Sequence, residues 1–327
     1  MKSEISLTHY SSMTYPRAHL VDQKNGGYYH CISRCVRQSW LCGTDHQNGK
    51  SYEHRRGWIA SRIQLLTNLF AVDVYAYAIM SNHYHIVVRL DPKRTNKWTD
   101  KDIVDRWLAR SGTKKSKRYL REQSKRLLEQ PNKINQIRSR LGSLSWFMRF
   151  INEPIARSAN AEDECAGRFW EGRFKSVALL DRTALLACMV YVDLNPARTS
   201  SRAKIPSLHT SAHQRARNSK KKLANFEDID TTLREYVDLL RWTRIQNQKA
   251  EDQTATSKPN LLDSINQDSQ NWLQWVSSFS YWYRAYGLRR ALDNYTLKLG
   301  QCWLQTPELR KMDLGNRPGF GRAAASA

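Results

Sequence analysis

Alternating and helical patterns of apolar residues predict the first four elements of the chain. Period-two alternation in YYHCISRCV (28–36) predicts a strand. Apolar residues at helical spacing through 51–70 predict an amphipathic helix. The segments VDVYAYAIM (72–80) and HYHIVVRL (83–90) alternate again and are separated by a short polar turn, so they predict a β-hairpin.

Three further elements follow the same patterns after a charged interruption. The segment 141–157 has the apolar spacing of a helix, and 167–180 predicts a turn that leads into a strand. A third helix is predicted from near Asp181 to about Leu194. The order strand, helix, strand, strand, helix, strand, helix predicts an α+β fold, in which a ferredoxin-like antiparallel sheet has helices on one or both faces.

Two segments of the chain are unusually basic. Residues 92–140 are highly charged, and KKSKRYLREQSKR (114–126) contains seven basic residues and one acidic residue, so we expect an inserted helical arm there. Residues 201–222 contain seven Lys or Arg and no acid, which predicts a loop on or near a polyanion.

The C-terminal third is predicted to be helical. We expect one helix at about 228–247, a polar linker at 248–260, and two helices rich in Trp and Tyr at about 261–286 and 288–304. The tail after Pro307 is expected to be disordered. The predicted units are a main domain at 15–200, a basic loop and helix at 201–247, a C-terminal helical region at 261–306 and a tail at 307–327.

The charge of the chain points to a polyanionic partner. The formal net charge is +23, from 53 Lys and Arg against 30 Asp and Glu. No stretch approaches the roughly 18 apolar residues that cross a bilayer, so we expect no membrane association. The first 20 residues lack the apolar block of a secretory signal, so we expect a reducing, cytoplasmic location.

The six cysteines form no CxxC pair, and disulfides are not expected in a reducing compartment. Cys31, Cys35 and Cys42 lie near His30 and His46 in the sequence, which leaves a structural zinc cluster open as an alternative. Their spacing matches no standard zinc finger, so buried thiols are the favoured interpretation.

Two histidines occupy alternate positions of a predicted strand. His83 and His85 therefore leave the same face of the sheet, where their rings can converge on one ion. Neutral imidazole is a common metal ligand. Tyr84, between them, is expected to pack against apolar residues on the opposite face. An HxH pair alone is also consistent with two half-exposed surface histidines.

Three separated blocks give this pair a context. SNHYHIVVRL (81–90), GRFWEGRFKS (167–176) and YVDLNPARTS (191–200), in this order, resemble the blocks of the HUH single-tyrosine transposases, and most closely the REP-associated tyrosine transposases of bacteria. The resemblance covers roughly 15–200, with 92–140 as an insertion. It implies an HUH nuclease core of the ferredoxin-like kind.

The resemblance also implies roles for particular residues. His83 and His85 would bind a divalent metal, Mg²⁺ or Mn²⁺, and Tyr191 would be the nucleophile. In the enzymes that the blocks resemble, a polar residue four positions after the tyrosine completes the metal site, which implies Asn195 here. One helical turn would place Tyr191 and Asn195 on the same face. Pro196 disfavours helix at the preceding residue, so the helix is predicted to end at Leu194, and Asp193 is the alternative ligand. A core aromatic is the alternative role for Tyr191.

Several side chains are candidates for binding DNA, with cations on phosphates and an aromatic ring on a base. Trp170 has a second interpretation as a core residue, and the basic run in the arm has a second interpretation as a solvated surface. The candidates are Trp170, Arg173, Lys175 and Arg198 in the matched blocks, and Lys114, Lys115, Lys117 and Arg118 in the arm.

The expected function is that of a metal-dependent endonuclease and strand transferase for single-stranded DNA, working through a 5′-phosphotyrosine. The resemblance implies short palindromes folded as hairpins as the substrate, a monomer, and a bacterial, nucleoid-associated protein. Two alternatives remain: a noncatalytic regulator that binds hairpin DNA with the same fold, and a zinc protein built around the three N-terminal cysteines.

Overall fold

The computed structural model describes most of the chain as one α+β arrangement around a five-stranded mixed sheet. The described residues are 20–36, 40–45, 49–112, 115–199, 210–217, 229–248, 257–281, 283–300 and 304. Several predictions from the sequence fall outside them: His46, Lys114, the tail at 307–327, and most of the basic segment 201–222 and of the linker at 248–260. The side chain of Arg198 also lies outside the description.

The sheet has the strand order β2-β3-β1-β4-β5. The pairs β2–β3, β3–β1 and β1–β4 are antiparallel, whereas β4 and β5 are parallel. The prediction of a purely antiparallel sheet is therefore wrong at one edge, because the two-residue strand β5 was not anticipated. The strands are β1 (Gly27–Arg34), β2 (Val72–Ile79), β3 (His83–Leu90), β4 (Lys175–Leu179) and β5 (Ala285–Tyr286).

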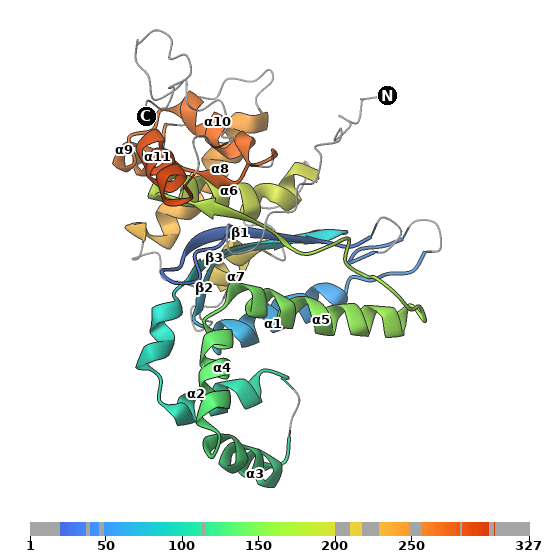
Figure 1. The fold of residues 1–327 in the computed structure, drawn as a ribbon. Helices are drawn as coiled ribbons and strands as arrows, with labels where there is room; N and C mark the ends of the chain where they lie inside the picture. The colour runs from blue at the N-terminus through green and yellow to red at the C-terminus, as the bar shows by residue number, and fades with distance from the viewer. Residues whose placement is uncertain are drawn as a thin grey trace.

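Helices cover both faces of the sheet, so the fold has three layers (Figure 1). The helices α1 (Arg55–Thr67) and α5 (Leu144–Glu162) pack on one face, where Tyr84 is fully buried as predicted. On the other face lies α6 (Arg182–Thr199), against β2 and β3. Period-two alternation explains this division, since successive side chains of a strand point to opposite faces.

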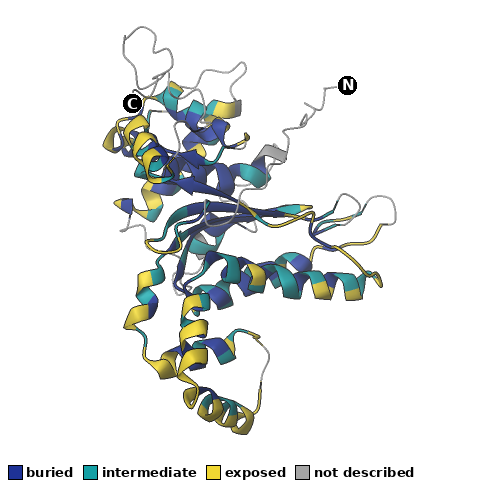
Figure 2. Ribbon diagram, in the orientation of Figure 1, coloured by how far each residue is buried: buried dark blue, intermediate teal, exposed yellow. Residues whose placement is uncertain are grey.

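The helical arm projects from the sheet as three helices after a short 3₁₀ turn (Figure 1). Its helical character is confirmed, and Figure 2 shows that α3 is mostly exposed. A capping box between Thr99 and Asp102 starts α2, and the Ser116 hydroxyl accepts from the backbone of Tyr119 to start α3. The elements are η2 (Pro92–Lys97), α2 (Asp100–Ala109), α3 (Lys117–Leu128) and α4 (Pro131–Leu141).

The C-terminal region is helical but more divided than predicted. The single helix expected at 261–286 is wrong: two helices are followed by β5, because Asn266 takes a positive φ of 53° and ends the first of them. The loop prediction is wrong at 211–217, which form a helix. The helices are α7 (Ser211–Arg217), α8 (Leu233–Gln248), α9 (Asn260–Ser264), α10 (Ser269–Ser278) and α11 (Arg289–Lys298).

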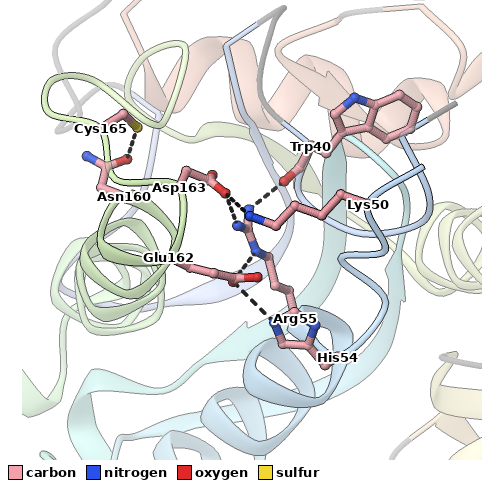
Figure 3. A network of polar contacts seen from close by, with 8 residues as sticks. All are labelled: Trp40, Lys50, His54, Arg55, Asn160, Glu162, Asp163 and Cys165. Carbon is pink, nitrogen blue, oxygen red and sulfur yellow. Dashed lines mark hydrogen bonds and ion pairs between the residues drawn. The ribbon is translucent and has the colours of Figure 1, made fainter. Parts of the chain in front are cut away.

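A buried arginine holds the loop between β1 and α1 against the end of α5 (Figure 3). Arg55 is fully buried and donates to Glu162 at 2.9 Å, to Asp163 at 2.5 Å and to the carbonyl of Trp40 at 2.8 Å. The carboxylates satisfy a guanidinium that would be costly to bury alone.

The same loop also holds the turn of the β2–β3 hairpin. The backbone N–H groups of Leu41 and Cys42 donate to the carbonyl of Ser81 at 2.9 and 3.0 Å, and that of Cys35 donates to the carbonyl of Asn82 at 2.9 Å. These bonds fix the turn that immediately precedes His83, and therefore the start of β3.

Candidate active site

Three histidine rings gather on the α6 face of the sheet. His83 and His85 leave β3 on the same side, and their Nε2 atoms lie 3.0 Å apart. The Nδ1 atom of His85 lies 2.9 Å from Nε2 of His30, which comes from β1, and the two rings are stacked. His83 Nδ1 lies 2.6 Å from Oδ1 of Asn82, so it donates its proton there and leaves the Nε2 lone pair free for an ion.

Helix α6 brings two more predicted residues to these rings. The Nδ2 atom of Asn195 lies 3.1 Å from Nε2 of His85, and the Tyr191 ring packs edge-on against the His85 ring with centroids 5.8 Å apart. Their spacing of four residues places both side chains on one face of the helix. The structure thus brings His83, His85, Tyr191 and Asn195 together.

The predicted end of this helix at Leu194 is wrong. The helix continues through Pro196 to Thr199, although a proline inside a helix removes one backbone hydrogen bond. Leu194 and Ala197, on either side of the proline, are both buried. Burial of these side chains outweighs the local preference of the residue before proline, and Asn195 stays on the helix.

Asp193, the alternative ligand, lies away from the histidines. Its carboxylate is buried and accepts from the Ser211 hydroxyl at 2.8 Å, the Tyr236 hydroxyl at 2.7 Å and the backbone of Ala212 at 3.2 Å. Burial raises the pKa of this carboxyl in spite of those three hydrogen bonds. The side chain connects α6 to α7 and α8, which excludes it from the site.

Two of the site histidines are held in the neutral form. Burial lowers the pKa of His30 to about 3, with a smaller contribution from His83. Burial also lowers the pKa of His83 to about 4, and the guanidinium of Arg34 acts in the same direction. Neutral rings keep a lone pair on one nitrogen, which is the form that can bind a metal.

Two members of this cluster were not predicted from the sequence. His30 lies beside Cys31 in the sequence, yet its side chain is on the face of β1 that points toward α6, and it is 2% exposed. Arg34 pairs directly with His83 across β1 and β3, and its side chain is exposed at the end of the strand. The alternation in 28–36 predicts that His30 and Arg34 lie on one face of the strand. It does not predict that β3 pairs with β1, which is what brings His83 and His85 beside them.

The second sequence block reaches the same end of the sheet. The backbone N–H of Glu171 donates to the carbonyl of Arg34 at 2.9 Å, and that of Val36 donates to the carbonyl of Phe169 at 3.0 Å. Arg173 and Lys175 are exposed beyond this contact, and Lys175 faces the α6 side because it pairs with Ile32. All three blocks therefore meet around His83.

Trp170 from that block is a core residue in this structure. Its ring is 9% exposed and lies edge-on to Tyr84, and its indole nitrogen donates to the carbonyl of Asn152 at 2.9 Å. A base-stacking role for Trp170 would require this ring to leave the core.

Access to Tyr191 is narrow. Its side chain is 9% exposed, and the ring of Phe279, at the end of α10, lies 5.9 Å away in a tilted arrangement. Phe279 also contacts the His30 ring, at 6.2 Å between centroids. The C-terminal region therefore covers part of the site.

Those basic candidates of the arm that the structure describes lie on its surface. Lys117 and Arg118 are exposed at the start of α3, where Arg118 forms an ion pair with Glu122 at 3.0 Å. The ammonium group of Lys115 lies 5.2 Å from the ring centroid of Tyr119.

Cysteine side chains show no sign of a zinc cluster. Cys31, Cys35 and Cys42 are buried in the hydrophobic core, and burial raises the pKa of Cys35 to about 11 and that of Cys42 to about 12. In the described part of the chain, no group of three or more His, Cys, Asp or Glu side chains is arranged to hold a metal ion. The interpretation as buried thiols fits these positions.

Comparisons with known proteins give one structural similarity. No family model and no curated protein matches the sequence. A solved structure, that of a REP-associated tyrosine transposase bound to a REP hairpin, aligns with 72% of this chain and 93% of its own, at 11% identity and a TM-score of 0.36. So loose an alignment does not establish a shared fold. Among the described residues, no helix is long and apolar enough to cross a membrane.

Proposed function

We propose that the protein is a metal-dependent endonuclease and strand transferase for single-stranded DNA, with Tyr191 as the nucleophile and a ferredoxin-like HUH core. One observation supports this most strongly: Nε2 of His85, on β3, lies 3.0 Å from Nε2 of His83 and 3.1 Å from the amide of Asn195, on α6. The contact between His85 and Asn195 joins segments 110 residues apart, and Tyr191 lies one helical turn before Asn195, which supports the proposal that these residues form one site.

The donor set of this point fits a divalent ion. Ligands at about 2.1 Å from an octahedral ion lie roughly 3 Å from their neighbours, which is the separation of the two imidazole nitrogens. The amide of Asn195 also carries an oxygen, the ligand atom that Mg²⁺ and Mn²⁺ favour. We therefore propose His83, His85 and Asn195 as the residues that hold the ion. When bound, the ion supplies charge neutralisation at the phosphate.

In the proposed reaction, Tyr191 becomes linked to the 5′ phosphate and a 3′-hydroxyl is released. The hydroxyl of Tyr191 gives its proton to solvent and its oxygen attacks the phosphorus. The bond from phosphorus to the 3′ oxygen breaks, and that oxygen takes a proton from solvent and leaves as a 3′-hydroxyl. The 5′ phosphate remains on Tyr191 as a phosphodiester. A 3′-hydroxyl from another strand reverses these steps and is joined, without a nucleotide cofactor.

His30 would act as a positioning residue in this mechanism. If His85 binds the ion through Nε2, its proton must be on Nδ1, and the acceptor 2.9 Å away is Nε2 of the neutral His30. A ligand histidine commonly donates its second nitrogen in this way, which fixes its tautomer and its orientation. His30 therefore selects the form of His85 that binds the ion.

Arg34 would hold the DNA phosphate. Its guanidinium is exposed beside His83 at the open end of the sheet, near Arg173 and Lys175 of the second block. A charged, bidentate donor at this position suits a phosphodiester. Because the three blocks resemble those of the REP-associated tyrosine transposases, we propose DNA hairpins with a single-stranded flank as the substrate.

The test is covalent trapping on a denaturing gel. Labelled hairpin oligonucleotides with single-stranded flanks are incubated with Mg²⁺ or Mn²⁺ and either the wild type or Tyr191→Phe. We expect a protein–DNA adduct that requires metal and disappears in the variant. A buried tyrosine on another element, Tyr77→Phe, is the matched control and should leave the adduct in place.

Other outcomes separate the alternatives. Tight binding of the hairpins without any adduct would favour the noncatalytic regulator. An adduct that survives Tyr191→Phe would reject Tyr191 as the nucleophile while leaving the metal site to be tested separately.

A further inference from the structure

A cluster of cations lies where the arm meets the body, on the face of the sheet opposite to the histidines. The arginine–tryptophan cluster consists of Arg110 at the end of α2, Arg140 on α4, Trp107 on α2, and Trp146 and Arg149 on α5. The guanidinium carbons of Arg110 and Arg140 lie 3.9 and 5.7 Å from the Trp107 ring centroid. Those of Arg140 and Arg149 lie 4.5 and 5.0 Å from that of Trp146.

Acidic partners are scarce in this cluster. Among the described residues, no carboxylate lies within ion-pair distance of Arg110 or Arg140, and only Arg149 is paired, with Glu153 at 3.1 Å. The guanidinium of Arg140 has no hydrogen-bond acceptor in the described part of the chain, although it has five N–H donors. The positive charges of Arg110 and Arg140, which both contact Trp107, are therefore not compensated by a described carboxylate.

A third guanidinium adds to the like charge. Arg62, on α1, is 9% exposed and donates to the carbonyls of Phe150 at 2.7 Å and Ser111 at 3.1 Å. Burial lowers the pKa of Arg110, and the charge of Arg140 lowers it further, while Arg110 has the same effect on Arg62. Like charges held this close oppose folding unless an anion binds between them.

The surrounding charge also favours an anion. The segment from 92 to 141 contains sixteen Lys and Arg against five Asp and Glu, which is nearly half of the excess charge of the whole chain. Such a local field concentrates polyanions at the surface.

We propose that the arginine–tryptophan cluster is a nucleic-acid site separate from the tyrosine site, and that Arg110 and Arg140 bind phosphates of a duplex stem. Trp107 is buried, and the half-buried ring of Trp146 has two guanidinium groups over it, so we expect the site to bind the DNA backbone without sequence preference. The cluster lies on the α5 face of the sheet, whereas Tyr191 lies on the α6 face, so the binding of duplex to the cluster does not rest on the proposed function.

The experiment measures affinity without catalysis. Fluorescence anisotropy in EDTA follows binding of a hairpin with a stem of about 20 base pairs, roughly 70 Å long, and of a single strand of the same length. The variants are Arg110→Gln with Arg140→Gln, and a control of equal charge change on the same arm, Arg126→Gln with Lys133→Gln, whose side chains are exposed. A melting curve accompanies each protein.

For the cluster variant, we expect the Kd for the hairpin to rise about tenfold or more and the salt slope to fall by about 1.8, as for two lost phosphate contacts. The control should raise the Kd by less than about threefold, since isolated exposed charges contribute only to the general field. The melting temperature of the cluster variant should be equal or higher, because repulsion is relieved.

Equal losses in the two variants would overturn the proposal, since general charge would then explain binding. So would a cluster variant that binds the hairpin normally but no longer binds vesicles of anionic lipid. If the melting temperature falls instead, Arg110→Lys with Arg140→Lys decides: affinity within about threefold of wild type supports an anion site, and a loss as large as that of the Gln variant refutes it. None of these results depends on whether the protein cleaves DNA.

Discussion

In the candidate active site, buried and half-buried polar side chains from β1, β3 and α6 have contacts of about 3 Å, and two of these contacts join segments that are distant in the sequence. In the helical arm, by contrast, most charged side chains are exposed, and two described ion pairs, Lys101 with Asp105 and Arg118 with Glu122, join residues four positions apart. The contacts of His85 with His30 and Asn195 in the first region depend on tertiary structure. The second depends largely on local sequence.

This difference predicts how each region responds to change. Removing one buried polar partner leaves another polar group unsatisfied in a low-dielectric interior, which costs roughly 1–3 kcal/mol and displaces its neighbours. An exposed ion pair contributes about 0–1 kcal/mol. Substitutions in the active site should therefore have large, specific effects, and those on the arm surface should have small, additive ones.

The largest effect is expected for His85→Ala. Its imidazole contacts His30, His83 and Asn195, so its loss removes the centre of the proposed metal site. The cleavage rate should fall about 10³-fold or more, because a Lewis acid contributes several kcal/mol and each 1.4 kcal/mol is a factor of ten. Single-turnover cleavage measures this, and hairpin affinity in EDTA should change little. A variant that keeps more than a tenth of the rate would contradict the metal site.

The next effect concerns His30. His30→Leu removes the acceptor for Nδ1 of His85 and should weaken Mn²⁺ binding about 10- to 100-fold, measured by calorimetry on the protein without DNA. His30→Gln keeps an acceptor oxygen and should restore part of the affinity. Val177→Ala, at the position paired with His30 on β4, is the packing control. Equal losses in all three variants would mean that packing alone is responsible.

A smaller effect is expected from pH in metal-free protein. His30 and His83 have pKa values of about 3 and 4 in the folded state, against an ordinary value of 6.5. The unfolded chain therefore binds more protons between pH 6.5 and 4, so stability should fall as the pH falls through that range. Urea unfolding in EDTA at several pH values measures it. His30→Gln should flatten the dependence, and an unchanged slope would show that other groups cause it.

The smallest effect is expected on the arm. Lys117→Gln with Arg118→Gln should change the free energy of unfolding by no more than about 0.5 kcal/mol, because both side chains are exposed. The salt slope of hairpin binding should fall by at most about 1.8. Urea titration and salt titration provide the two values. A loss of more than about 1.5 kcal/mol would show that the arm surface is structurally more connected than its exposure indicates.

The two regions also differ in what the sequence reveals. Alternation located β1, β2 and β3, and helical spacing located α5 and the start of α6, because those signals repeat within a few residues. The convergence of His83 with Asn195 was expected only from the resemblance of three blocks. The contact between His30 and His85 depends on the pairing of β1 with β3, where the two rings are diagonal neighbours, and no local pattern encodes that pairing.

The elements that the sequence did not predict, or predicted wrongly, also depend on tertiary contacts. Strand β5 has two residues, too few for any periodicity, and exists because β4 lies beside it. Helix α6 continues past Pro196 because its neighbours on either side of the proline are buried. The arginine–tryptophan cluster draws its members from three helices, so composition predicted the basic arm but not the place where its charges are uncompensated.

The position of Tyr191 and Asn195 on a single helix has a consequence for how this site can change over time. The offset between the two side chains is set by the rise of about 1.5 Å per residue and not by any loop or interface. A substitution in β2, α8 or α10 that shifts α6 moves both groups by the same vector. Substitutions in the surrounding sequence can therefore change the position of Tyr191 and Asn195 relative to the DNA without changing the distance between them.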